Sequence, residues 1–304
     1  MAKLVMLVGI SGSGKSTVAK NAMEANPDKV VVVSSDGIRG EMFGDENVQK
    51  DPHKVFNEVH KRVREALKED KIVYYDATNL NAKRRMNFLK TIEHLDAEKE
   101  CIVVLSTPEE CVERQSLRER RVPVSVINKQ IKQFQCPYYY EGWDNIELLY
   151  NIFKEPVRLP DLMELNKIPH DNSHHEHDIY EHMKAAEHLY CNTVSIIDLG
   201  VAEAIKYHDL GKFFTKTFTN MKDEVTEEAH YYGHQNAGAY FYLLDYEHAR
   251  KMPIVHLLRV ANLIQFHMEP FFRKGEAWYK FAEMIGPIMA TDIIKIHHID
   301  VTSA

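Results

Sequence analysis

A glycine-rich segment near the amino terminus has the residues and spacing of a phosphate-binding loop. Residues 9–16 read GISGSGKS, which fits G-x-x-x-x-G-K-[ST] without a mismatch. An apolar run precedes the segment and a helix-like stretch follows it, so its N–H groups and the helix N-terminus can face phosphates. We expect ATP with Mg²⁺ here, with Lys15 on the β- and γ-phosphates and Ser16 on the metal. Further contacts to the nucleotide are expected from Gly9, Gly12, Ser13, Gly14 and Thr17.

Two polar side chains follow the next apolar run, residues 30–34. Asp36 lies just beyond its end, where active sites of open α/β folds are found, and can accept a proton from an acceptor hydroxyl. Arg39, one helical turn further on, can bind an acceptor phosphate through two parallel hydrogen bonds. An N-cap aspartate followed by a surface arginine would leave the same pattern.

A third carboxylate and a basic cluster follow the run 72–75. Asp76 can organise Mg²⁺ and water, position the acceptor, or simply cap the next helix. The cluster 83–85, Lys-Arg-Arg, opens a helix where the dipole disfavours positive charge, so it fits either a phosphate partner or a solvated face.

Arginines recur along one helical face in the stretch 109–119 and just beyond it. Arg114, Arg118 and Arg121 are spaced i, i+4 and i+7. They fit a mobile lid that closes on the transferring phosphate, or an exposed face paired with glutamates. Pro123 ends the helix as a hinge would and favours the lid.

Histidine is concentrated in the later part of the chain, since fourteen of the seventeen follow residue 152. His208 and Asp209 are adjacent metal-ligand types, and Gly211 allows the turn that lets both reach one ion. Further ligands must come from other helices, and the candidates are His182, His234, His267 and Asp292, with His256 as an alternative to His267. Imidazole and carboxylate ligands suit Mn²⁺, Fe²⁺, Ni²⁺, Co²⁺ or Zn²⁺. One or two such ions activate water and stabilise phosphoryl charge, and Lys212 can hold that phosphate.

The elements that must position these residues change character along the chain, whose 304 residues suit two domains. Strands at 4–9, 30–34, 72–75, 102–105 and 146–150 alternate with helices at 15–25, 53–69, 82–95 and 109–119. This predicts an α/β P-loop domain with a parallel sheet over 1–151. Proline-containing residues 152–172 are expected to be the linker. Helices at 179–191, 201–207, 227–244, 254–267 and 277–296, with no strand, predict an all-α domain over 173–304.

Charge and composition limit the class of protein. The formal net charge of -7 argues against a protein that coats long nucleic acid, so a nucleic-acid substrate would be held at an end or a nick. The four cysteines lack paired motif spacing and are expected to be reduced thiols in the cytoplasm. No run of about 18 apolar residues is present, so we expect no membrane span, and the apolar segment 4–10 is interpreted as a strand rather than a signal peptide.

Four motifs in order, GISGSGKST, SSDGIRGEMFG, DATNLNAKRR and ERQSLRERRVP, resemble the polynucleotide 5′-kinase family of phage end-healing enzymes over about residues 1–150. The resemblance implies that Asp36 is the general base for a 5′-hydroxyl and that Arg39 holds the acceptor 3′-phosphate. It implies that Asp76 lies on the acceptor side and that Arg118 is a lid arginine on the donor phosphates. Lys15 and Ser16 match the P-loop pair of that family.

Five further strings, NSHHEHDIYEHM, YHDLGK, HYYGHQNAGAYF, ANLIQFHMEP and IMATDI, resemble the HD phosphohydrolase superfamily over about residues 172–300. The resemblance implies that His182 is the first ligand, His208 and Asp209 the name-giving pair, and Asp292 the last ligand. His234 and His267 match the extra ligands of dinuclear members, and His175 matches an auxiliary histidine near the substrate phosphate.

Together the two resemblances imply a bifunctional end-healing enzyme for RNA or DNA ends. One half would phosphorylate a 5′-hydroxyl, and the other would remove a 3′-phosphate or 2′,3′-cyclic phosphate. The resulting ends are those that an RNA ligase needs, so an RNA ligase is expected as a functional partner. We expect a cytoplasmic location, that of the host if a phage encodes the chain. Two alternatives stay open: a nucleoside or small-molecule kinase fused to an HD nucleotidase, and a nucleotide-gated sensor with a non-catalytic HD module. The preference for RNA or DNA, the metals and the oligomeric state are also open.

Overall fold

The computed structural model describes residues 1–46, 48, 50–117, 121–153, 168–171 and 178–303. The chain forms two compact units. Unit 1 comprises Met1–Gln130 and Pro137–Glu155, and unit 2 comprises Ile131–Cys136 and Pro156–Ala304. The inclusion of Ile131–Cys136 in unit 2 was not expected from the sequence, and most of the expected linker lies outside the described residues.

Unit 1 is built on a five-stranded sheet whose strand order is β2-β3-β1-β4-β5 and whose pairings are all parallel. The strands are β1 (Ala2–Val8), β2 (Val30–Ser34), β3 (Ile72–Asp76), β4 (Ala97–Leu105) and β5 (Asn145–Tyr150). Asp76 pairs with Leu7 on one side and with Ser34 on the other, so the ends of three strands lie in one row. The predicted α/β fold with a parallel sheet is confirmed. The segments that follow β1, β2 and β3 therefore all leave the sheet at the carboxyl ends of the strands.

The helices of unit 1 cover both faces of the sheet. They are α1 (Lys15–Ala25), α2 (Ser35–Phe43), α3 (Pro52–Lys68), α4 (Ala82–Lys90), α5 (Pro108–Ser116) and the greater part of α6 (Val124–Gln133), whose last three residues belong to unit 2, with a 3₁₀ turn, η1 (Tyr139–Glu141). In β1, Val5 and Leu7 share an apolar cluster with Ala19 of α1, and the alternate residues Leu4 and Met6 are fully buried as well. Because alternate side chains of a strand face opposite ways, both faces of the central strand are covered.

Two helices of unit 1 were missed and one was predicted too long. The helix α2 was not predicted as an element of its own, and the Ser34 hydroxyl caps it by accepting from Gly37 N at 3.3 Å. The helix α6 follows Pro123 and was not predicted. The helix α4 was expected to reach residue 95 but ends at Lys90. The chain turns directly after it, at Thr91, whose hydroxyl donates to the Phe88 carbonyl.

The basic cluster at the start of α4 divides into one buried and two exposed members. Arg85 is 1% exposed, and its guanidinium donates to Glu141 Oε2 at 2.7 Å and Oε1 at 2.6 Å, and to the Asn79 carbonyl at 2.8 Å. The Trp143 indole donates to the same carboxylate at 3.0 Å. Arg85 therefore holds η1 against α4 and is not available for a phosphate.

We expect Arg85→Met to destabilise unit 1 by about 3–5 kcal/mol, because it leaves the buried Glu141 carboxylate without its cation. Urea unfolding followed by Trp143 fluorescence in a Trp278→Phe background would measure this loss. Lys20→Met is the matched control, since Lys20 and its partner Glu24 are both exposed. Equal unfolding midpoints for the two variants would contradict the prediction.

Unit 2 is helical, and α11 (His234–Leu244) and α13 (Ile254–Phe266) are its most buried helices. Around them lie α8 (Ile179–Thr193), α9 (Leu199–Tyr207), α10 (Lys212–Thr215), α12 (Tyr246–Ala249), α14 (Glu269–Phe272), α15 (Glu276–Ile285) and α16 (Pro287–Thr302). No helix in the described part of the chain combines the length and apolar content needed to cross a lipid bilayer.

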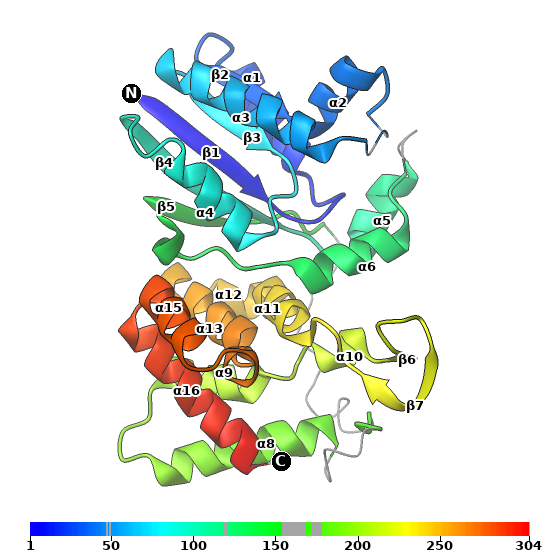
Figure 1. The fold of residues 1–304 in the computed structure, drawn as a ribbon, viewed down its shortest axis with the longest axis vertical. Helices are drawn as coiled ribbons and strands as arrows, with labels where there is room; N and C mark the ends of the chain where they lie inside the picture. Colours follow the sequence, from blue (N-terminus) through cyan, green and yellow to red (C-terminus); the bar gives the residue numbers. More distant parts are fainter. Residues whose placement is uncertain (47, 49, 118–120, 154–167, 172–177, 304) are drawn as a thin grey trace. The chain divides into compact units, whose positions relative to one another are not determined.

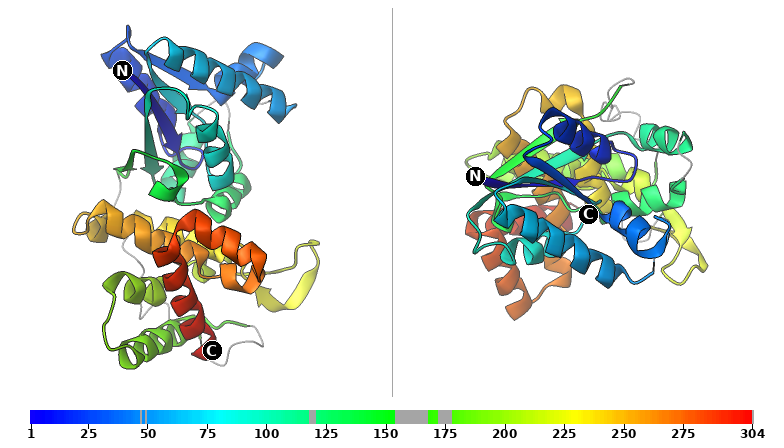
Figure 2. Two further views of the ribbon diagram at one scale, coloured as in Figure 1. Left: turned by 60° about the vertical axis from the view of Figure 1, so that its left-hand side comes forward. Right: turned by 90° about the horizontal axis from the view of Figure 1, so that it is seen from above.

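The expectation of no strand in this half was wrong. An antiparallel ribbon, β6 (Thr217–Thr219) and β7 (Val225–His230), projects from the helices of unit 2 (Figure 2). The helix predicted over 227–244 therefore starts only at His234, after Gly233 with φ +75°. The helix predicted over 277–296 is two helices, because Gly286 with φ +89° precedes Pro287 and the chain cannot continue as one helix there.

Candidate phosphate and metal sites

The P-loop follows β1 and turns into the N-terminus of α1. Gly12 and Gly14 have φ of +87° and +105°, which glycine adopts at little cost. The Lys15 ammonium lies 2.8 Å from the Ile10 carbonyl and 3.5 Å from Ser13 Oγ, so it stays within the loop. The loop lines a cavity of about 1010 Å³, to which Gly12, Gly14, Lys15 and Ser16 contribute.

The acceptor residues proposed from the sequence line the same cavity. Asp36 and Arg39 form an ion pair on α2, and Asp76 reaches the cavity from the end of β3. Of the arginines assigned to a lid, Arg121 lines the cavity, while Arg118 lies outside the described residues. Asp36 is the most open of the acceptor residues, with 47% of its side chain exposed, as a base that meets a hydroxyl requires.

Three predicted nucleotide contacts and one lid arginine do not line the cavity. Gly9, Ser13 and Thr17 are absent from its described lining. At Gly9, an added Cβ would lie 2.6 Å from the Val104 carbonyl, so glycine is needed for packing. Arg114 donates to the Gly12 carbonyl at 3.1 Å and also to Ser106 Oγ and the Asn151 carbonyl, so it is held at the P-loop rather than in a lid.

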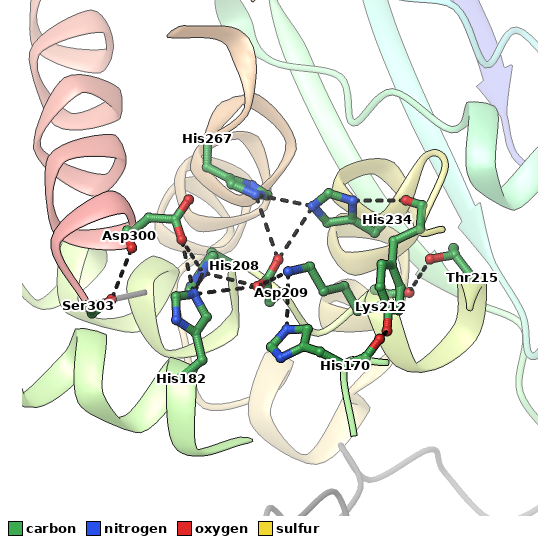
Figure 3. A network of polar contacts seen from close by, with 12 residues as sticks. His170, His182, His208, Asp209, Lys212, Thr215, His234, His267, Asp300 and Ser303 are labelled. Atoms are coloured by element: carbon green, nitrogen blue, oxygen red, sulfur yellow. Dashed lines mark hydrogen bonds and ion pairs between the residues drawn. The ribbon is translucent and has the colours of Figure 1, made fainter. Parts of the chain in front are cut away.

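Histidines and aspartates of unit 2 converge on one point (Figure 3). The Nε2 atoms of His182 and His208 are 3.2 Å apart, and both face Asp300 Oδ1, at 3.0 and 3.3 Å. Asp209 Oδ2 lies 3.6 Å from His182 Nε2 and 3.4 Å from His208 Nε2. These four side chains form the first of two groups able to hold a metal ion.

The second group shares Asp209 with the first. Asp209 Oδ1 lies 3.4 Å from His234 Nε2 and 4.0 Å from His267 Nε2, and these two nitrogens are 3.3 Å apart. Asp209 thus presents one oxygen to each group and can bridge two ions. Ligands about 2.0–2.2 Å from one ion must themselves lie about 3–4 Å apart, so the donor separations fit divalent metals.

Backbone carbonyls orient three of the imidazoles. The Nδ1 atoms of His208, His234 and His267 lie 2.7, 2.9 and 2.6 Å from the carbonyls of the residues three positions earlier. An Nδ1–H donated to a carbonyl leaves the Nε2 lone pair as the ligand atom, and in all three residues Nε2 faces Asp209. His208 and His267 directly follow the last residues of α9 and α13, and His234 opens α11, so three helix ends carry this arrangement.

Comparison with known proteins finds a family model that matches part of the chain. Residues 4–137 match the AAA domain family model. The bifunctional polynucleotide phosphatase/kinase of Schizosaccharomyces pombe is 27% identical over 150 residues, which cover 48% of this chain and 33% of the relative. The chain thus spans about a third of that curated relative.

Two solved structures are also similar. One, from a Pnkp1/Rnl/Hen1 RNA repair complex, is 30% identical, with 43% of each chain covered and a TM-score of 0.40. A fungal RNA kinase is 18% identical, with 49% of this chain and 38% of that chain covered and a TM-score of 0.36. The span matched by the AAA domain model contains Lys15, Asp36 and Asp76, and the histidine cluster lies outside it.

The electrostatics of the cluster favour cations. Burial, together with the neighbouring His234 and His208, lowers the pKa of His267 to about 3. Burial also lowers the pKa of His234, so both imidazoles are neutral donors. At His208 burial acts in the same direction, but the Asp209 and Asp300 carboxylates outweigh it and raise the pKa to about 10. The carboxylates therefore stabilise positive charge between the ligand atoms.

Lys212 and a histidine missed in the sequence lie beside Asp209. The Lys212 ammonium is 2.7 Å from Asp209 Oδ2 and 3.3 Å from His170 Nε2, and both residues are buried. His170 went unnoticed because it directly follows Pro169 in the stretch interpreted as linker. His175, predicted to lie near the substrate phosphate, is outside the described residues.

The structure bears on two of the metal ligands proposed from the sequence, Asp292 and the choice between His256 and His267. Asp292 does not join the cluster, because its carboxylate is paired with Arg259 at 2.6 Å and Lys295 at 2.9 Å. Asp300, about two turns later on the same face of α16, lies in the cluster instead. Of the alternatives for one position, His267 is in the cluster, whereas His256 is bonded to Glu203 at 2.7 Å.

We expect Asp300→Asn to lower the metal content of the purified protein, because it removes the charge of a ligand that faces two imidazoles. The matched variant Asp292→Asn, on the same helix, should keep its metal. Inductively coupled plasma mass spectrometry of both proteins, with circular dichroism to check folding, measures the difference. Metal loss from Asp292→Asn alone would restore the assignment made from the sequence.

Proposed function

We propose that the chain is a bifunctional nucleic-acid end-healing enzyme. Unit 1 would phosphorylate 5′-hydroxyl ends of RNA or DNA with ATP and Mg²⁺, and unit 2 would remove a 3′-phosphate or 2′,3′-cyclic phosphate. The observation that carries the proposal is that Lys15, Ser16, Asp36, Arg39 and Asp76 line one and the same cavity. The similarity to a bifunctional polynucleotide phosphatase/kinase supports this acceptor class.

The geometry of unit 1 suits transfer of a phosphoryl group to a hydroxyl. Lys15 and the loop N–H groups would hold the β- and γ-phosphates, and Ser16 would hold Mg²⁺. Asp36 would accept the proton of the attacking hydroxyl. Arg39, only 8% exposed and paired with Asp36, would fix the orientation of that carboxylate and bind the acceptor phosphate.

In unit 2 the chain would supply ligands for up to two divalent ions, and Asp209 would belong to both ligand sets. His182, His208 and Asp300 would complete one set, and His234 and His267 the other. The bound ions would supply Lewis acidity and an activated water. Lys212, held 2.7 Å from Asp209, would bind the phosphate that is released.

The products of the two reactions, a 5′-phosphate and a 3′-hydroxyl, are the ends that a nucleic-acid ligase joins. We therefore propose a functional partnership with an RNA ligase in the cytoplasm. One of the similar structures comes from a Pnkp1/Rnl/Hen1 RNA repair complex.

Mapping both ends of one oligonucleotide tests the proposal. An RNA and a DNA oligonucleotide, each with 5′-hydroxyl and 3′-phosphate ends, are incubated with ATP and with Mg²⁺, Mn²⁺, Ni²⁺, Co²⁺ or Zn²⁺. We expect a gained 5′-phosphate and a lost 3′-phosphate. Transfer to free nucleosides without transfer to oligonucleotides would instead identify a small-molecule kinase, and no metal-dependent hydrolysis would refute the role of unit 2.

A further inference from the structure

Two side chains behind the P-loop hold its carbonyl groups. Asn151, the residue after β5, donates from Nδ2 to the Ser13 carbonyl at 2.7 Å. Arg114 of α5 donates from Nη1 to the Gly12 carbonyl at 3.1 Å. The two are also joined to each other, because Arg114 Nη2 donates to the Asn151 carbonyl at 2.8 Å. Both lie in unit 1, and neither lines the described cavity.

The Arg114–Asn151 pair is itself fixed in place. The Ser106 hydroxyl donates to the Asn151 carbonyl at 3.0 Å and accepts from Arg114 at 2.6 Å. The Asn151 N–H donates to the Leu105 carbonyl at 2.8 Å, and the buried Glu110 accepts from Arg114 at 3.2 Å. The pair therefore presents its donors to the loop from a rigid base formed by β4, β5 and α5.

The direction of these bonds determines where the loop N–H groups point. In a trans peptide the N–H points opposite to the C=O of the same unit. Because the Ser13 carbonyl points at Asn151, the Gly14 N–H points away from Asn151, and Gly14 lines the cavity. The approach is close: a Cβ on Gly14 would lie 2.2 Å from Asn151 Nδ2. The peptide group between Gly12 and Ser13 is held in a similar way. Its carbonyl accepts a hydrogen bond from Arg114, and its N–H donates to the Ile10 carbonyl at 3.2 Å.

We propose that Asn151 and Arg114 are positioning residues that hold the P-loop in its phosphate-binding conformation before the nucleotide arrives. The inference rests on the proposed kinase function of unit 1. Without the pair, the loop peptides would have to be oriented during binding, and that ordering would weaken the binding of nucleotides whose β-phosphate contacts the loop. AMP, which lacks that phosphate, would be unaffected.

The test compares nucleotide affinities of variants that remove the donor. Asn151→Leu and Asn151→Asp keep approximately the size of the side chain, and each should raise the Kd of ADP and ATP about 2- to 10-fold, as expected for one hydrogen bond. Arg114→Ala should raise it about 10- to 100-fold and Arg114→Lys less, because lysine keeps the charge. The Kd of AMP and the KM of the oligonucleotide acceptor should not change. Glu109→Gln, on the exposed face of α5, is the control.

Calorimetric titration with AMP, ADP and ATP, together with the unfolding temperature of each variant, separates the outcomes. A wild-type Kd for ATP in both Asn151 variants would overturn the inference, even if their unfolding temperatures fall. An equal loss for AMP would also overturn it, since Asn151 would then act on the nucleoside. If the wild-type protein binds ATP but transfers no phosphate to a 5′-hydroxyl, the proposed function fails while the positioning role is still decided by the titrations. If it does not bind ATP, both fail.

Discussion

Asp209→Ala is expected to abolish phosphate release from the 3′ end while leaving 5′ phosphorylation near the wild-type rate. Asp209 gives one oxygen to each group of ligands, and among the described residues no other side chain belongs to both groups. Changes to residues that merely support a metal ligand cost about 10- to 100-fold in metal affinity or activity, and removal of the shared ligand should cost more. Both activities are measured on one oligonucleotide, together with the metal content of the same preparation.

The Asp209 experiment needs a folding control, because the variant also leaves the buried Lys212 without the carboxylate at 2.7 Å. Asp209→Asn keeps the shape of the side chain and serves as a second variant. Glu227→Ala, which removes an exposed carboxylate from β7, should change neither activity. An Asp209→Ala protein that keeps its metal and its phosphatase activity would refute the proposed metal site, and loss of both activities from a folded protein would show that the two reactions are coupled.

Asp36→Asn should lower the rate of 5′ phosphorylation by about 10²- to 10⁴-fold, because an amide cannot accept the proton of the attacking hydroxyl. The change is nearly isosteric and leaves Lys15 and Ser16 in place, so the Kd of ATP should change little. Single-turnover transfer from radiolabelled ATP to a 5′-hydroxyl oligonucleotide measures the effect.

The matched control for Asp36 is Asp28→Asn, an exposed aspartate of unit 1 that does not line the cavity. Hydrolysis at the 3′ end should be normal in both variants. Transfer by Asp36→Asn at a rate close to that of the wild type would mean that another group, such as the Asp76 carboxylate that lines the same cavity, removes the proton.

Much of unit 1 could be predicted because its signals are local. An apolar, β-branched run followed by the P-loop pattern predicts a strand, a turn and a helix, and α1 has the predicted bounds, Lys15–Ala25. The missed helix α2 shows the limit of local signals. Its two glycines weaken the helix signal, and the cap from Ser34 and the burial of Ile38 within unit 1 favour the helix.

The metal cluster shows a second limit, which is the choice between equivalent residues on one helix face. Asp292 and Asp300 are separated by about two turns of α16, so spacing alone fits either. Arg259 decides between them, since it pairs with Asp292, and that contact joins residues 33 positions apart. His170 could not be predicted from the sequence for the same reason. It lies 42 positions from Lys212 in the chain, and only the fold brings its Nε2 to 3.3 Å from the Lys212 ammonium.

The path of the chain between the units limits how the two activities can be separated. The chain enters unit 2 for Ile131–Cys136, returns to unit 1 for Pro137–Glu155, and leaves again at Pro156. Within unit 2, the fully buried Phe134 packs edge-on against Tyr240, and the Cys136 N–H donates to Gln265 at 2.6 Å. A fragment that starts at Pro156 would therefore lack part of its own core, while the complementary fragment would carry an apolar segment with nothing to cover it. No single cut yields both units intact, so point variants in the undivided chain, rather than fragments, are the means to assign each activity.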